Sequence, residues 1–189
     1  MIEILQQHII SRLGNDIDNL ETVLQYFKPL YVKRNEFILK EGDLCRHVYF
    51  VAKGCLQVYV HDSDMNETTR DIVTEGAWCS ELISFGTGVP AAEYIKAIEP
   101  CQLLAIDKES FQKLMQTVPQ FDKVYKQVLE SSYANAVYRI NTFVSMAALD
   151  RIKWLMDKRP GLMTRVSGRI IASYLAINKD VFSRLKTKL

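Results

Sequence analysis

Four polar residues near the end of the chain have the types and spacing that suit recognition of base edges in double-stranded DNA. They are Lys179, Asp180, Ser183 and Arg184. In a helix these positions fall on one face, because each turn takes 3.6 residues. Basic side chains donate to guanine in the major groove, and a carboxylate accepts from cytosine. Three more basic residues lie where backbone phosphates would pass: Arg169, Lys186 and Lys188.

The charge of the chain is unevenly divided. From Arg151 onward there are ten Lys and Arg residues against two Asp and Glu residues. The formal net charge of the whole chain is +2, so the first 150 residues carry −6 and the remainder +8. Such a division favours a C-terminal segment that meets a polyanion. A solvated basic tail would give the same composition.

Two short helices would position these side chains. Ser167 can cap a helix over residues 168–175, and Asn178 can cap a second over residues 179–188. Ala172 provides a small residue at the closest approach of the helices, and Ile177 fills the angle between them. This pattern predicts a helix-turn-helix, and an ordinary helical hairpin is the alternative. Ala176 stands at the turn, where glycine is commoner because φ is positive there.

The segment from Leu30 to Ile106 has the character of a β domain. Residues 48–51 and 56–60 are its clearest strands, and they are joined tightly through Lys53-Gly54. Turn signals at regular intervals indicate an antiparallel barrel or roll. Amphipathic helices are expected before it, over residues 2–13 and 17–27, and after it, over residues 108–117, 120–145 and 148–158.

The helix expected over residues 120–145 would be near 37 Å long at about 1.5 Å per residue. It has an apolar stripe at steps of three to five residues, formed by Phe121, Val124, Val128, Tyr133, Val137, Ile140 and Val144. A long helix with one apolar stripe needs a partner, and a second copy of the same helix is the simplest one. Packing against the β domain is the alternative.

Enzymatic and metal chemistry find little support. The cysteines, Cys45, Cys55, Cys79 and Cys101, form no C-x-x-C pair, and the three histidines are scattered. No phosphate loop or activated nucleophile is recognisable, so we expect no catalysis. A haem ligated by His47 or Cys45 is conceivable but has no supporting motif. No leader-like start and no run of 18 apolar residues are present, so a cytoplasmic location is expected.

The order of these parts resembles the Crp/Fnr superfamily of transcription regulators. The resemblance rests on Glu41-Gly42-Asp43, on Val48 through Gly54, and on the motif from Ile171 to Arg184. It implies an α+β fold: an antiparallel, jelly-roll-like β-roll sensor with flanking helices (1–117), a dimerisation helix (118–147) and a small winged-helix-type helix-turn-helix domain (148–189). Lys179, Asp180 and Arg184 match the family's base-reading Arg, Glu and Arg. The chain stops soon after them, so any wing must come from residues 162–166.

The resemblance also locates an effector pocket, formed by Ser80, Glu81, Leu82, Ala91 and Ala92. Glu81 matches the family's ribose-binding glutamate, although it could equally be a helix cap. The arginine and serine that hold the cyclic phosphate are replaced by Ala91 and Ala92. Losing a charge-assisted pair costs about 1.5–3 kcal/mol, so we predict no useful affinity for cyclic AMP.

The implied function is a DNA-binding transcription regulator with an unknown small-molecule effector. Its implied partners are double-stranded DNA and a second copy of the chain, and RNA polymerase is a further candidate. The alternative is a ligand-binding or protein-interaction module with the same fold that does not bind DNA.

Overall fold

The computed structural model describes residues 1–13 and 19–188. They form two compact units. The first comprises Met1–Tyr59 and Ile72–Glu130, and the second comprises Val60–Asp71 and Ser131–Leu189. The hairpin of residues 60–71 therefore belongs with the C-terminal helices, a grouping that sequence order does not suggest.

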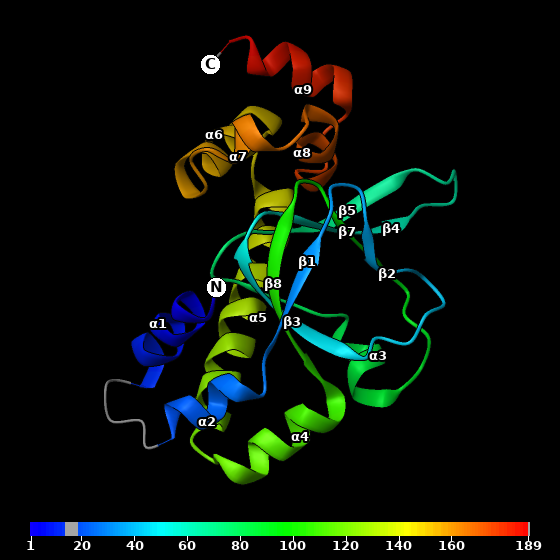
Figure 1. The fold of residues 1–189 in the computed structure, drawn as a ribbon. Coiled ribbons are helices and arrows are strands. Elements are labelled where there is room, and N and C mark those ends of the chain that lie inside the picture. Colours follow the sequence, from blue (N-terminus) through cyan, green and yellow to red (C-terminus); the bar gives the residue numbers. More distant parts are fainter. Residues whose placement is uncertain (14–18, 189) are drawn as a thin grey trace. The chain divides into compact units, whose positions relative to one another are not determined.

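Two four-stranded sheets make the β-roll (Figure 1). The first has the order β1 (Lys28–Val32), β8 (Cys101–Asp107), β3 (His47–Lys53) and β6 (Trp78–Cys79). The second has the order β2 (Phe37–Leu39), β7 (Tyr94–Ala97), β4 (Leu56–His61) and β5 (Glu67–Val73). The pairings β1–β8, β3–β8, β3–β6, β2–β7 and β4–β7 are antiparallel. The expected antiparallel roll is confirmed.

The tight connection through Lys53-Gly54 is confirmed, because β3 ends at Lys53 and β4 begins at Leu56. The two strands belong to different sheets, so this turn carries the chain from one sheet to the other. Gly54 has φ +103°, and a Cβ atom there would lie 2.6 Å from Cys101 Sγ and 2.8 Å from the Pro100 carbonyl oxygen. Glycine is needed because the chain turns sharply against its neighbour as it leaves one sheet for the other.

Helices cover the roll within the first unit. They are α1 (Ile2–Leu13), α2 (Leu20–Gln25), α3 (Leu82–Thr87), α4 (Lys108–Thr117) and the start of α5 (Phe121–Ser145). Leu5 and Ile9 of α1 are fully buried in the core with Phe50 of β3. The bounds of α1 and α4 coincide with those expected. The second helix begins at Leu20, and the Ile17 start expected for it lies outside the described residues.

The second unit is helical apart from its β-hairpin. It contains the rest of α5, followed by α6 (Ala148–Lys158), α7 (Leu162–Arg165), α8 (Gly168–Tyr174) and α9 (Lys179–Lys186). Residues 162–165, where a wing was expected, form the short helix α7 instead. In the described part of the chain after residue 107, every assigned element is a helix.

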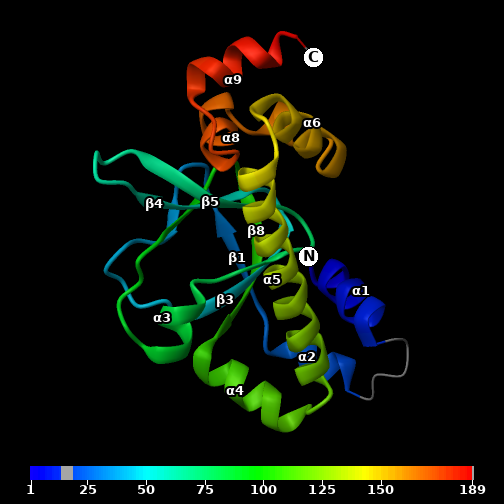
Figure 2. The ribbon, with the colours of Figure 1, turned by 180° about the vertical axis from the view of Figure 1, so that it is seen from behind.

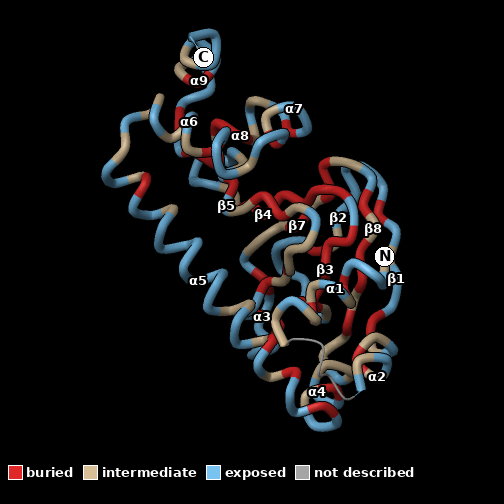
Figure 3. Tube along the Cα trace, turned by 90° about the vertical axis from the view of Figure 1, so that its left-hand side faces the viewer, coloured by how far each residue is buried: buried red, intermediate tan, exposed pale blue. Residues whose placement is uncertain are grey.

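The helix α5 runs without interruption for 25 residues (Figure 2). Its first turns are anchored by Phe121 and Val124, which are buried. All residues from 131 to 138 are exposed, so no side of these two turns is covered, and Figure 3 shows most of the helix in the colour of exposed residues. The start of the stripe thus packs in the core of the first unit, while Tyr133, Val137, Ile140 and Val144 are exposed.

A half-buried histidine beside the core of the first unit is held neutral. Trp78 Nε1 donates a hydrogen bond to His8 Nε2 over 2.9 Å, and Phe50 lies against the imidazole with ring centroids 5.0 Å apart. An indole can only donate, so His8 Nε2 must be unprotonated. Burial, and secondly the charge of Arg12, lower the pKa of His8 from 6.5 to about 4.

This shift predicts a specific loss of stability in acid. The unfolded chain binds a proton at His8 near pH 6.5 and the folded chain only near pH 4, so the free energy of unfolding falls as the pH drops through that window. Between pH 7 and pH 4.5 we expect a loss on the order of 2 kcal/mol from this residue. Urea denaturation followed by tryptophan fluorescence measures it.

The comparison variant is His8→Gln, whose amide oxygen can accept from Trp78 and cannot titrate in this range. It should retain its stability in acid better than the unmodified protein. Equal losses in the unmodified protein and in His8→Gln would contradict the assignment.

Candidate nucleic-acid interface and effector cassette

The two helices of the predicted helix-turn-helix begin at the expected caps. Ser167 Oγ accepts from the Ile170 amide over 3.4 Å at the start of α8. Asn178 Oδ1 accepts from the Asp180 amide over 2.9 Å and from the Val181 amide over 3.4 Å at the start of α9. Each side chain satisfies amide groups that have no partner inside the helix. Both predicted caps are confirmed.

The turn between the helices uses a left-handed residue. Ala176 has φ +51°, which confirms that an alanine occupies the conformation in which glycine is commoner. The Ile177 amide donates to the Ala172 carbonyl over 2.9 Å, and both residues are buried. Ile177 therefore fills the angle between α8 and α9, as the sequence predicts.

An arginine from a neighbouring helix holds this turn. Arg151 Nη1, from α6, donates to the carbonyl oxygens of Leu175 over 2.8 Å and Ala176 over 3.2 Å. These are carbonyls at the C-terminus of α8, which lack partners within the helix. Sequence reasoning counted Arg151 only as one positive charge. The role was missed because nothing in the local pattern indicates a partner 24 residues away.

The packing of α9 on α8 decides which side chains remain exposed. Phe182 is buried, and a Cβ atom added at Gly168 would lie 3.3 Å from Phe182 Cε1. Gly168 is thus the point where α8 leaves room for the aromatic ring. With Phe182 buried beneath α8, the opposite face of α9 is turned to solvent.

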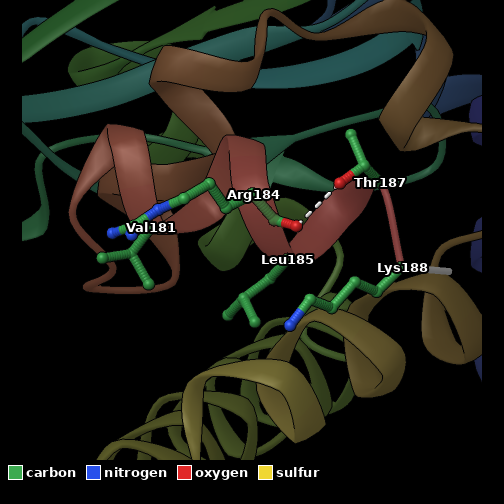
Figure 4. Close-up of a pocket in the computed structure, with 5 residues that line it drawn as sticks. All are labelled: Val181, Arg184, Leu185, Thr187 and Lys188. Carbon is green, nitrogen blue, oxygen red and sulfur yellow. Dashed lines mark hydrogen bonds between the residues drawn. The ribbon is translucent and has the colours of Figure 1, made fainter.

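The predicted DNA-contacting residues all lie on exposed surface. These are Lys179, Asp180, Ser183, Arg184, Lys186 and Lys188 of α9 and its end, together with Arg169 of α8. Arg184 and Lys188 also border an open hollow of about 370 Å³ whose wall includes Val181 and Leu185 (Figure 4). Arg169 differs from the others because it forms an ion pair with Glu67 of β5, at 3.3 Å.

The effector cassette has a different character. The Glu81 carboxylate is buried and accepts from the amides of Ile83, over 3.3 Å, and Ser84, over 2.7 Å, at the start of α3. Of the two roles left open by the sequence, the helix cap is therefore present. Ser80 Oγ donates to the His47 carbonyl over 3.0 Å. Leu82 is exposed.

Ala91 and Ala92, which the resemblance matches to the family's phosphate-binding residues, carry only methyl groups. Ala91 is buried, its amide donates to the Asp43 carbonyl over 2.8 Å, and its carbonyl accepts from the Gly42 amide over 2.8 Å. Its neighbour Ala92 is exposed. Neither side chain can donate a hydrogen bond or neutralise a charge. These two side chains therefore give an anion no hydrogen-bond donor and no positive charge.

Comparisons with known proteins agree with this architecture. Residues 29–118 match the family model of the cyclic nucleotide-binding domain. A cAMP-activated global transcriptional regulator CRP from Pasteurella multocida is 24% identical over 134 residues, which are 69% of this chain and 64% of that protein. The chain thus spans slightly under two thirds of the length of this relative.

Two solved structures share the fold. The c-di-GMP-responsive global regulator CLP of Xanthomonas campestris has a TM-score of 0.72 at 19% identity, with 90% of this chain and 89% of that chain covered. FixK2 of Bradyrhizobium japonicum has a TM-score of 0.73 at 18% identity, with coverage of 86% and 84%.

Fold and site together define a protein with a cyclic nucleotide-binding-type β-roll, a long helix and a helix-turn-helix. The chain contains a cyclic nucleotide-binding domain and has the fold of Crp/Fnr regulators, so the resemblance expected from the sequence is confirmed. In the described residues, no helix is both long and apolar enough to cross a membrane.

The strained turn yields a stability prediction. An L-residue in the left-handed region costs roughly 1 kcal/mol relative to glycine, and Ala176 is exposed, so its methyl group contributes little packing. We expect Ala176→Gly to raise the free energy of unfolding by about 0.5–1 kcal/mol, because the lost strain exceeds the added chain entropy.

Thermal and urea unfolding of the two proteins measure the effect. Ala172→Gly is the matched comparison, since Ala172 is buried inside α8 and the same change should destabilise the helix by about 1 kcal/mol. A destabilised Ala176→Gly variant would show that the turn is not strained.

Proposed function

We propose that this chain is a homodimeric, DNA-binding transcription regulator that acts in the cytoplasm. The observation that carries the proposal is the capped helix-turn-helix, whose second helix buries Phe182 and presents Lys179, Asp180 and Arg184 to solvent. A helix held this way can enter the major groove with its N-terminal residues at the base edges. In this assignment Lys179, Asp180, Ser183 and Arg184 read bases, and Arg169, Lys186 and Lys188 bind phosphates.

The dimer is inferred from α5. The uncovered turns carry large apolar side chains: Tyr133 is 72% exposed, Ile140 58% and Val144 84%. Exposing that much apolar surface on one helix is unfavourable, and a second copy of α5 can cover it by coiled-coil packing. A dimer would present two copies of α9 to successive major grooves, which matches a pseudo-palindromic target.

The DNA-binding proposal is tested on DNA fragments selected from a genomic library by the purified protein. Sedimentation should show a dimer. In mobility-shift assays the logarithm of the affinity should fall linearly with the logarithm of the salt concentration, with a slope of about −0.9 for each phosphate contact. A monomer that ignores duplex DNA even in dilute buffer would overturn the proposal and favour the non-DNA-binding module.

Two substitutions separate the roles within α9. Arg184→Ala should cost about 1–3 kcal/mol at the selected site and flatten sequence preference, because it removes a base contact. Lys188→Ala should weaken all duplexes about equally and reduce the salt slope by about 1 per subunit. If Arg184→Ala weakens every duplex equally, Arg184 contacts phosphate and its assigned role is wrong.

The effector is proposed to be something other than cyclic AMP. The buried methyl group of Ala91 replaces the charge that a cyclic phosphate requires, and the Glu81 carboxylate is engaged as a cap. Calorimetry on the purified protein should show no micromolar binding of cyclic AMP. The double change Ala91→Arg with Ala92→Ser should increase affinity by about ten- to hundred-fold.

Circular dichroism of the double variant checks that the new arginine is accommodated, and Ala92→Ser alone is the control that adds no charge. Micromolar or tighter binding of cyclic AMP by the unmodified protein would contradict this prediction. A gain from Ala92→Ser equal to that of the double variant would show that the charge is not the missing element.

A further inference from the structure

The start of β5 is bonded to the face of α8 that bears Arg169. Ser173 Oγ accepts from the Thr69 amide over 2.8 Å and donates to the Glu67 carbonyl over 3.0 Å. On the same face of α8, four residues earlier, Arg169 Nη2 lies 3.3 Å from Glu67 Oε2. One strand segment thus engages α8 by both its backbone and a carboxylate, and all of these residues belong to the second compact unit.

A half-buried arginine holds the same strand segment from α5. Arg139 donates to the carbonyl oxygens of Thr69, over 3.2 Å, and Arg70. Its guanidinium lies 4.5 Å from the ring centroid of Tyr174, in α8, and 5.0 Å from that of Phe143. Both contacts are favourable cation–π interactions. The clasp formed by Glu67, Thr69, Arg139, Arg169 and Ser173 therefore ties β5, α5 and α8 together.

The clasp occupies surface that DNA would need. In a helix-turn-helix the first helix crosses the phosphate backbone, and Arg169 is the basic side chain that α8 offers there. In the structure its partner is the Glu67 carboxylate, which takes the position of a phosphate oxygen. Phosphates approaching Arg169 would also meet the negative charge of Glu67, and like charges repel.

The ion pair is weak enough for a DNA phosphate to replace Glu67 as the partner of Arg169. The Arg169 side chain is 64% exposed and the Glu67 side chain 22%, so solvent screens their attraction and the pair is weak. A phosphate on a duplex, with its neighbours, attracts a guanidinium more strongly than one partly solvated carboxylate does. The hydrogen bonds of the Ser173 hydroxyl to the backbone of Thr69 and Glu67 must then open for α8 to leave β5.

We propose that this clasp is an autoinhibitory contact, in which the start of β5 competes with the DNA backbone for the Arg169 and Ser173 face of α8. The inference rests on the proposed DNA-binding function. Opening of the clasp raises affinity for DNA of every sequence, because the contact at stake is to phosphate. Base preference, which α9 determines, stays unchanged.

Charge-neutral substitutions of nearly the same shape test the clasp. Glu67→Gln should raise affinity for both the selected site and random duplex by about three- to tenfold, and should steepen the salt slope, because Arg169 becomes free to bind phosphate. Asp64→Asn is the matched control. It removes the same charge from the exposed tip of the same hairpin, where the Asp64 amide bonds only locally to Asp62.

A double-mutant cycle assigns the effect to the pair. In an Arg169→Ala background, Glu67→Gln should change affinity no more than Asp64→Asn does. Equal gains from Glu67→Gln and Asp64→Asn in the unmodified background would overturn the clasp, since general electrostatics would explain them. A loss of affinity in Glu67→Gln would also overturn it, because Glu67 would then be positioning Arg169 for DNA.

Amide hydrogen exchange provides a readout of the clasp itself. Without DNA, Ser173→Ala should speed exchange of the Thr69 amide, because its acceptor is lost. Addition of the selected duplex should speed exchange of Thr69 in the unmodified protein. If Thr69 stays protected on saturating DNA, the clasp does not open and the inference fails while the proposed function stands. If no variant binds duplex DNA, the proposed function itself fails.

Discussion

The burial of one aromatic ring underlies the proposed function of this protein. Phe182 is enclosed beneath α8 at a point where Gly168 has no side chain, and this contact sets which face of α9 is turned to solvent. Caps at Ser167 and Asn178 start the two helices, and Arg151 closes the turn between them. If the ring were displaced, the polar face of α9 would lose its fixed direction, and its basic side chains would no longer be held in defined positions.

The effector cassette shows how a fold can be kept while its chemistry changes. The backbone around Ala91 is bonded to Gly42 and Asp43, and Glu81 caps α3, so the local structure needs no bound phosphate. The side chains of Ala91 and Ala92 contribute no charge and no hydrogen-bond donor. The shape of a β-roll and the chemistry of its lining are therefore separate properties, and the first does not fix the second.

The hairpin of residues 60–71 belongs both to a sheet of the β-roll and to the compact unit of the C-terminal helices. Its strands belong to the second sheet, while its residues group with the helices that carry the helix-turn-helix. Within that unit, polar contacts join β5 to α8 and α5. Such contacts can exchange for others at small cost in free energy, which makes them suitable for regulation.

The amino-acid sequence alone determined the antiparallel roll, the bounds of α1, α4 and α6, both helix caps and the left-handed turn at Ala176, because these depend on periodicity and on local backbone chemistry. Only the tertiary structure decided that β3 and β4 lie in different sheets, that Glu81 is engaged as a cap, that Arg151 holds the turn and that Arg169 pairs with Glu67. The cap at Glu81 is local, and the structure only chose between two readings that the sequence left open. The other three depend on which distant residues meet, and Glu67 and Arg169 are separated by about a hundred positions. Local patterns contain no record of such pairings, because the energy that selects them comes from the packing of the whole unit.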